Sequence, residues 1–272
     1  SCVYQNGKAP NARVRRPFEP VTMLKYTVNP LENLEAGATL LWRTGFNGYS
    51  ALDWYDAPDP RPDYYRNLPS YSWLDDEDFG RVNQDKYDYA YYMWTAPGNS
   101  YDNYRHINWD RLYNVNYNSE GGRSKYALEE RRVDQRDFNL SGNFKWRADR
   151  NFTLTGGFDA KINRTENYKI LADLLGGDYF LNIDNFAERE YAATAEKLQN
   201  DLHYYWGNGS AKSLSKGDKY GYDYYAHVRS ADLWAKLDYS YGAFTASAAG
   251  TVGAVGFWRE GLVRKGLFAG LD

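Results

Sequence analysis

The chain has 272 residues, 18% of them aromatic, and its 33 basic and 36 acidic residues give a formal net charge of −3. This near balance gives no bulk attraction to nucleic acid, so we expect no nucleic-acid partner. The single cysteine, Cys2, excludes an internal disulfide framework and offers no metal-ligand spacing.

The chain begins with a polar, basic segment that predicts a loop, followed by a strand at about residues 18–28. Asn29–Asn33 is predicted to be the turn into a return strand that starts at Leu34 and runs towards Trp54. Both strands alternate apolar or small residues with polar ones, which indicates one apolar and one polar face. The residues of the apolar face are Leu24, Tyr26, Val28, Leu34, Ala36, Ala38, Leu40, Trp42 and Phe46.

From Asp56 to about Ser124 the alternation stops. This stretch is rich in tyrosine and proline, and it is predicted to contain short helices near 84–95 and 108–116. About 70 residues without regular strands would be unusual in a compact soluble domain. Such a length is ordinary for an extracellular loop of a membrane barrel.

A strand from about Tyr126 leads into the clearest pattern of the chain, a hairpin within Arg136–Ile170. A slip of phase at Val133–Arg136 predicts a bulge, and Ala148–Asn151 is the predicted turn. Each arm keeps its phase for about ten residues, roughly what a tilted strand needs to cross a bilayer. The predicted apolar face consists of Phe138, Leu140, Gly142, Phe144, Trp146, Phe152, Leu154, Gly156, Phe158, Ala160 and Ile162.

A second long insertion follows Ile170 and extends to about Lys219. Within it Asp184–Trp206 is predicted to be helical, with Asp184 as the N-cap. The last hairpin turns at Tyr241–Ala243. Its predicted apolar positions are Leu233, Ala235, Leu237, Tyr239, Phe244, Ala246, Ala248, Val252 and Trp258.

These elements predict an all-β fold, an antiparallel up-and-down meander of about six strands with two long loops that contain short helices. Short turns alternate with very long loops, and aromatic residues gather at both ends of the strands, as in bacterial outer-membrane barrels. We therefore interpret residues 1–272 as part of a single transmembrane β-barrel domain. A soluble β-sandwich, which shares the alternation, is the alternative. The barrel is favoured because short turns alternate with very long loops along the chain.

Little in the sequence indicates catalysis. His106, His203 and His227 lie far apart without ligand spacing, so we expect no metal site and no cofactor. The acidic run Asp75–Asp78 has the oxygen ligands that Ca²⁺ prefers, but a solvated acidic loop is the favoured interpretation. No pair of carboxylates stands out as the acid and nucleophile of a glycoside hydrolase. The chain is therefore predicted not to be an enzyme.

The aromatic residues of the first long loop are the candidate ligand-binding surface, because Tyr and Trp stack well on flat apolar faces. The favoured alternative is that they pack the loop against itself. Charged residues of the polar face, such as Arg43, Lys161 and Lys236, are expected to face a plug or a substrate path, and plug contact or simple solvation is the favoured interpretation of their role. The candidate ligand-binding residues are Tyr64, Tyr65, Tyr71, Trp73, Tyr89, Tyr92 and Trp94.

Four strings resemble segments of TonB-dependent outer-membrane receptors of the Bacteroidetes type. They are Asp59–Tyr71 (DPRPDYYRNLPSY), His106–Asp110 (HINWD), Arg123–Arg132 with its opening RSKY, and Leu174–Phe180 (LLGGDYF). They are specific to a subfamily but are not catalytic motifs, so no residue role accompanies them. The resemblance implies a 22-stranded barrel of the plugged class in the bacterial outer membrane.

On this resemblance the chain is a fragment without the plug domain, the segment that contacts TonB or the closing strand. The implied partners are outer-membrane lipid, the protein's own plug, inner-membrane TonB and a surface lipoprotein. The ligand could be a small molecule, a glycan or a peptide, captured at the extracellular loops and imported without covalent chemistry. The alternative function is a soluble or surface-attached β-rich glycan-binding module.

Overall fold

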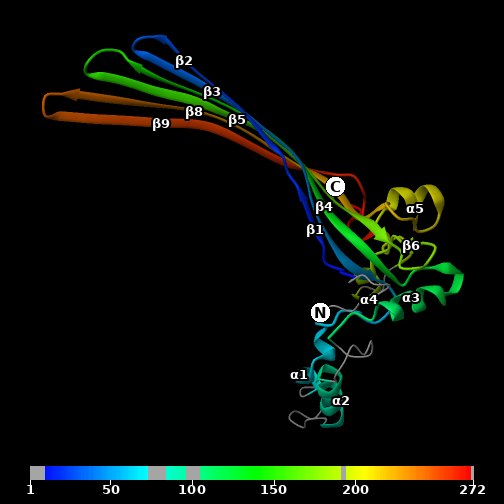
Figure 1. Cartoon of the computed structure of the whole chain (residues 1–272). Helices are drawn as coiled ribbons and strands as arrows, with labels where there is room; N and C mark the ends of the chain where they lie inside the picture. The colour runs from blue at the N-terminus through cyan, green and yellow to red at the C-terminus, as the bar shows by residue number, and fades with distance from the viewer. Residues whose placement is uncertain (1–9, 73–83, 96–104, 191–193, 271–272) are drawn as a thin grey trace. The chain divides into compact units, whose positions relative to one another are not determined.

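The computed structural model describes residues 10–72, 84–95, 105–190 and 194–270. Strands account for 54% of the described residues and helices for 19%, and the strands are mostly antiparallel, as the sequence predicts. The chain divides into two compact units, which we call the loop unit and the sheet unit (Figure 1). The loop unit comprises residues 1–14, 49–130 and 170–220, and the sheet unit comprises residues 15–48, 131–169 and 221–272.

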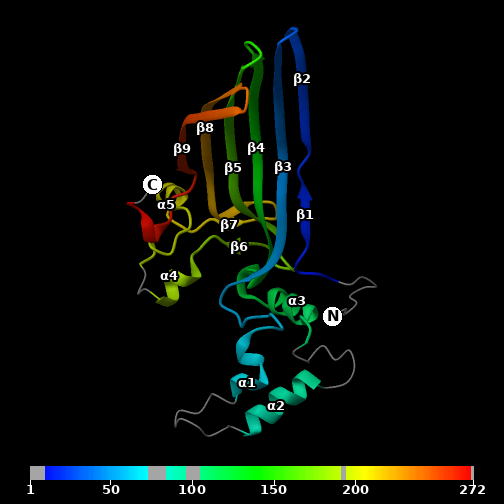
Figure 2. The ribbon, with the colours of Figure 1, turned by 90° about the vertical axis from the view of Figure 1, so that its left-hand side faces the viewer.

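Seven strands form one open sheet in the order β1-β3-β4-β5-β8-β9, with β2 also paired to β3. From β2 to β9 the strands of this sheet lie side by side in chain order, and the short β1 also pairs with β3, so the predicted antiparallel up-and-down order is confirmed for these strands. In the sheet unit the three short turns lie at one end of the strands (Figures 1 and 2). The strands are β1 (Arg15–Phe18), β2 (Val21–Leu31), β3 (Leu34–Trp54), β4 (Tyr126–Arg147), β5 (Phe152–Asp173), β8 (Lys219–Tyr241) and β9 (Phe244–Gly261).

The first hairpin has a shorter turn than the sequence predicts. The β2 strand continues through Pro30 to Leu31, which pairs with Leu34, and only two residues remain for the turn. The register shifts between Val28 and Leu31. Proline cannot donate to a ladder, but β2 pairs only with β3 in this sheet, so it is an edge strand that tolerates the missing N–H. The predicted turn at Asn29–Asn33 was therefore too long.

The second hairpin forms where the alternation predicts it. Its turn is fixed by Asp149, whose Oδ1 accepts hydrogen bonds from the backbone N–H groups of Asn151 (2.6 Å) and Phe152 (2.9 Å). In the middle of the hairpin the ring of Phe158 lies on Gly142, where an added Cβ would be only 2.4 Å from Cε1. The Phe158 ring therefore fills the space above Gly142, and a side chain at position 142 would require this ring to move.

The third hairpin places two predicted apolar rows on one face. Leu233 pairs with Val252, and Leu237 pairs with Ala248, in an unbroken register that ends at Tyr241 and Phe244. Directly paired residues of antiparallel strands point to the same side of the sheet. The two-residue turn begins at Gly242, whose φ of +58° suits glycine. The first hairpin behaves likewise, since Leu24 pairs with Leu40 and Tyr26 with Ala38.

The apolar face of the sheet unit remains open to solvent. Phe138 is 42% exposed, Phe152 38%, Ile162 54% and Leu233 60%. Side chains under a second sheet or a helix layer would be almost fully buried. This exposure does not fit the sandwich alternative, in which the alternating apolar face forms the core.

The loop unit contains the helices. The predicted helices near 84–95 and 108–116 are confirmed as α2 (Gln84–Thr95) and α3 (Trp109–Tyr117). The helix predicted over Asp184–Trp206 was wrong as one element. Within that range and just beyond it the structure has α4 (Asn185–Glu190) and α5 (Leu202–Asn208). The predicted N-cap is confirmed, since Asp184 Oδ1 accepts from the N–H groups of Phe186 (3.0 Å) and Ala187 (3.2 Å).

Two small hydrophobic clusters form the core of the loop unit. The first includes Leu52, Trp109, Leu112, Tyr126 and Leu175, and the second includes Ala127, Leu171, Phe180, Leu214 and Tyr220. A two-stranded sheet, β6 (Phe180–Leu181) with β7 (Ser213–Leu214), supports the second cluster. The remaining elements are α1 (Pro69–Ser72) and the 3₁₀ turns η1 (Tyr65–Asn67), η2 (Glu120–Gly122) and, in the sheet unit, η3 (Gly266–Phe268). Within the described ranges no helix has the length and apolar character to cross a membrane.

Candidate functional site: an aromatic loop region and a two-faced sheet

Three of the predicted ligand-binding aromatics lie together in the loop unit. The ring of Tyr65 contacts Tyr64 at 5.0 Å and Tyr71 at 5.1 Å between centroids, both edge-on. Trp94 donates from Nε1 to the carbonyl of Asn67 at 2.7 Å, which ties α2 to the η1 turn. These contacts support the interpretation that part of the aromatic set packs the loop against itself.

Two further predicted aromatics and one ring of this group are exposed to solvent. Tyr89 and Tyr92 on α2 are 59% and 62% exposed, and Tyr65 is 51% exposed. Trp73 lies outside the described residues, as does the acidic run Asp75–Asp78. The structure therefore leaves Tyr65, Tyr89 and Tyr92 as the accessible members of the predicted surface.

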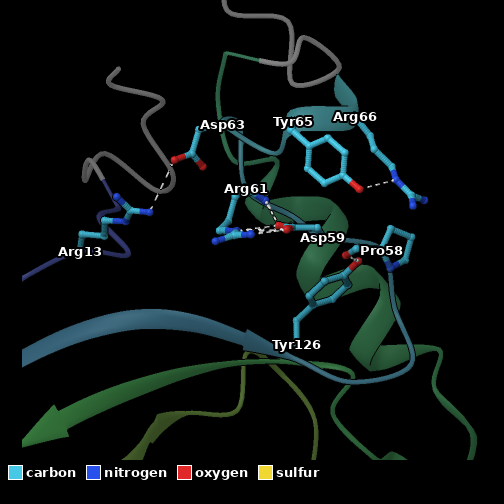
Figure 3. A network of polar contacts seen from close by, with 8 residues as sticks. All are labelled: Arg13, Pro58, Asp59, Arg61, Asp63, Tyr65, Arg66 and Tyr126. Carbon is cyan, nitrogen blue, oxygen red and sulfur yellow. Dashed lines mark hydrogen bonds and ion pairs between the residues drawn. The ribbon is translucent and has the colours of Figure 1, made fainter. Parts of the chain in front are cut away.

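Polar contacts hold the segment before η1 in place (Figure 3). Arg61 donates to the carboxylate of Asp59 from Nε at 2.9 Å and from Nη2 at 2.6 Å. Its guanidinium lies over the ring of Trp54, 5.0 Å from the ring centroid. The hydroxyl of Tyr126 donates to the carbonyl of Pro58 at 2.8 Å. A bidentate Arg–carboxylate pair fixes the orientation of both side chains in addition to pairing their charges. The pair Asp59–Arg61 therefore has a structural role in this segment.

Asn116 connects its own helix to two other segments through its buried side chain, which is 1% exposed. The two N–H groups of its amide are shared among the carbonyls of Tyr126 (2.8 Å), Leu174 (3.0 Å) and Leu175 (3.0 Å). Its Oδ1 accepts from the N–H groups of Lys125 (2.8 Å) and Tyr126 (3.0 Å). One side chain thus satisfies backbone groups from segments up to 59 residues away.

The segments that meet at Asn116 continue to pair beside it. Ser124 donates from its backbone to Tyr179 and from its hydroxyl to Leu174, both at 2.7 Å. Asp178 N–H donates to the carbonyl of Gly122 at 2.7 Å. Residues of three of the strings, His106–Asp110 through Trp109, Arg123–Arg132 and Leu174–Phe180, therefore contact the same region of the loop unit, and in this structure they hold the two long loops together.

A polar cluster lies beside this region at Tyr55. Its hydroxyl donates to Glu188 at 2.8 Å, and the guanidinium of Arg123 lies 4.2 Å from its ring centroid. Burial and the nearby Glu188 carboxylate raise the pKa of Tyr55 to about 12. The phenol is therefore protonated at neutral pH, when it donates to Glu188 and joins α4 to the end of β3.

The sheet unit carries an exposed apolar band with aromatic residues at both ends. At the turn end Phe152 packs on Tyr239 at 4.6 Å, and Tyr239 lies 6.3 Å from Phe244. At the other end stand Trp42 and Trp258, 54% and 42% exposed. Glycine and small residues occupy much of the sheet between, where a hollow of about 730 Å³ crosses the strands. The band thus has aromatic borders and an interior of small side chains.

The opposite face of the same strands is charged. Asp137, with a side chain only 7% exposed, accepts from Arg43 at 2.7 Å and from Asn163 at 3.1 Å, and Lys161 lies 3.7 Å away. Lys236 pairs with Asp238 at 2.8 Å further along the sheet. The predicted polar face is thus confirmed as a set of ion pairs that spans β3, β4, β5 and β8.

Comparison with protein-family models, with characterised proteins and with solved structures finds no match to this chain. Across the described ranges no three His, Cys, Asp or Glu side chains gather as a possible metal site.

Sequence reasoning missed Asn116, whose importance depends on partners far along the chain. It also missed that Arg136, Arg164 and Arg229 line one hollow at the border of the apolar band. The sequence does contain a signal for the three arginines. Each lies two residues beyond the end of a row of alternating apolar residues, and therefore on the same face of its strand. Asn116 carries no comparable signal.

Proposed function

We propose that this chain forms part of the wall of a TonB-dependent outer-membrane transporter. Its apolar face meets lipid, its charged face meets the plug or the substrate path, and its long loops meet ligand outside the cell. The observation that carries the proposal is the exposed apolar band with aromatic residues at both ends. An exposed apolar patch of this extent needs a partner, and hydrocarbon is the partner that the pattern fits.

The length of the band supports this proposal. Ten residue steps separate Phe152 from Ile162 on β5, and ten separate Ala231 from Tyr241 on β8. At about 3.3 Å per residue this is about 33 Å along the strand. For strands inclined by about 40° it corresponds to a layer about 25 Å thick, the height of the apolar belt on outer-membrane barrels.

The open edges of the sheet support a wall that other strands complete. On β9 both faces are exposed, including Val255 at 70% and Phe257 at 82%, and β2 is equally exposed at the other edge. Unpaired strand edges cannot persist in hydrocarbon, because their N–H and C=O groups would lack partners. In the membrane these edges would therefore pair with further strands of a closed barrel.

The loop unit supplies the proposed ligand contact. Its α2 helix exposes Tyr89 and Tyr92, and its internal hydrogen bonds give this surface a stable base. Ligand capture requires no covalent chemistry, so the proposed protein binds and admits its ligand and is not an enzyme. Energy from inner-membrane TonB would act on the plug of the intact transporter.

Flotation with lipid vesicles tests the membrane part of the proposal. We expect the full chain, refolded in the presence of phosphatidylcholine vesicles, to float with them and to keep its strand content, with its open strand edges paired to those of other copies of the chain. Protease should cut the loop unit and spare residues 131–169, since the band would be covered by lipid. The matched control is the same refolding in plain buffer, where the exposed band should cause aggregation.

The alternative is a soluble or surface-attached glycan-binding module in which the exposed tyrosines form a sugar platform. A chain that is monomeric and folded in plain buffer, and that does not float, would contradict the transporter and favour the module. The transporter class has its own test in cells that carry the intact gene. There, ligand uptake should stop when the TonB protein is deleted.

A further inference from the structure

A second hollow in the sheet unit lies at the border of the apolar band, at the end away from the short turns. Its volume is about 330 Å³, at the lower end of the range for pockets that hold small ligands. Four strands contribute to it, and we call it the arginine hollow. Its lining residues are Trp42, Arg136, Asp137, Phe138, Ile162, Asn163, Arg164, His227 and Arg229.

The three arginines share one feature of sequence position, which places all of them on the same face of the sheet. Arg136 precedes Phe138 by two residues, and Arg164 follows Ile162 by two. Arg229 precedes Ala231 by two, within the unbroken β8–β9 register. Residues two apart on a strand share a face. Each arginine therefore stands on the apolar face at the place where the apolar row ends.

None of these three cations is neutralised by a carboxylate within the described part of the chain. Arg164 lies over the ring of Tyr225 at 4.7 Å and Arg229 over Trp258 at 5.0 Å. Such contacts use the face of a guanidinium and leave N–H groups at its edge for other partners. The acid in the lining, Asp137, is already engaged by Arg43 and Lys161.

His227 adds an oriented ring. Its ring stacks on Trp258 at 4.7 Å with only 3° between the planes, and its Nε2 lies 3.1 Å from Glu260. The aromatic ring and the carboxylate hold the imidazole at the side of the hollow. The arrangement is a rigid aromatic wall beside a cluster of guanidinium groups.

We propose that the arginine hollow binds a phosphate group carried by a glycolipid of the outer leaflet. Guanidinium forks match phosphate oxygens in bidentate geometry, and a dianionic phosphate would offset three neighbouring positive charges. The lipid assignment rests on the proposed function, because only then does the end of the apolar band lie at the level of the headgroups. Trp42, Phe138 and Ile162 beside the hollow would then contact the first part of the acyl chains.

Titration calorimetry on the full chain in nonionic detergent tests the binding of the anion. The probes are inorganic pyrophosphate and a diphosphorylated acyl-disaccharide, compared with the same acyl-disaccharide without phosphates. We expect the diphosphorylated lipid to bind and the dephosphorylated lipid to bind at least about tenfold more weakly, given the usual strength of charge-assisted hydrogen bonds. Arg136→Gln and Arg229→Gln should each weaken binding of the phosphorylated lipid by about ten- to a hundredfold.

The matched control is Arg150→Gln, since Arg150 is exposed in the turn at the opposite end of the sheet. It should leave the affinity unchanged. Pyrophosphate binding as tight as that of the lipid, and equally lost in Arg136→Gln, would overturn the lipid assignment in favour of a free-phosphate site. Equal affinity of all variants for all probes would overturn the site itself. Flotation reports on the proposed function separately, because it does not require these arginines.

Discussion

Val252→Arg is expected to prevent stable insertion of the sheet unit into lipid. Val252 is 70% exposed near the middle of the apolar band and pairs with Leu233 on the same face. An arginine on the lipid face of a barrel at mid-depth costs about 2–4 kcal/mol. The measurement is the fraction of chain that floats with vesicles after refolding, which should fall at least about tenfold for this variant.

The matched control is Thr251→Arg, one residue away on the charged face and opposite Trp234. Its arginine would point to water, so its flotation should stay close to that of the unaltered chain. Equal flotation of the two variants would contradict the assignment of the two faces. If both variants lost flotation and also lost strand content, the cause would be misfolding of the β8–β9 hairpin.

Asn116→Ala should destabilise the loop unit by about 3 kcal/mol or more. The change removes the five hydrogen-bond contacts of this side chain and takes that partner from the N–H groups of Lys125 and Tyr126 and from the carbonyl of Leu175, whereas the carbonyl of Leu174 keeps the Ser124 hydroxyl. A buried polar group left unsatisfied costs about 1–3 kcal/mol. Limited proteolysis should show faster cleavage within residues 105–130 and 170–190, because these segments would no longer be held together.

Asn118→Ala is the control for this prediction. Asn118 lies at the end of the same helix, is exposed, and makes one side-chain hydrogen bond, to Asn114 O. Its loss should change the cleavage rate by less than about threefold. Equal cleavage of Asn116→Ala and the unaltered chain would show that the long loops do not depend on this side chain.

Much of the sheet could be predicted because the alternation of apolar and polar residues indicates, residue by residue, which face of a strand each side chain occupies. Phe152 to Ile162 keeps its phase, and the structure places a strand over all of it. The helix near 84–95 was predictable from the break in alternation, and Asp184 from its capping position. The bulge predicted at Val133–Arg136 stays a prediction. In the structure the irregularity of β3 lies at Gly45, with a φ of +127°.

The rest depends on contacts that local sequence does not encode. The β6–β7 pair joins Phe180 to Leu214 across more than 30 residues, and neither strand is long enough to show a period. The helix predicted over Asp184–Trp206 is interrupted because Asp184 N–H and Asn200 N–H bond to the carbonyls of Leu198 and Asn182 in a local pairing of the chain. Only the folded loops bring such partners together.

The central claim is that alternate side chains of these strands face hydrocarbon and water. It is tested most directly by a scan of β5, a strand with neighbours on both sides. Cys2 is replaced by serine, and a polarity-sensitive fluorophore is attached in turn at each cysteine introduced from Phe152 to Ile162, in vesicles. We predict blue-shifted emission, quenched by lipid-borne quenchers, at even positions and water-like emission at odd positions. Emission without a two-residue period, or lipid contact at the odd positions, would contradict the account.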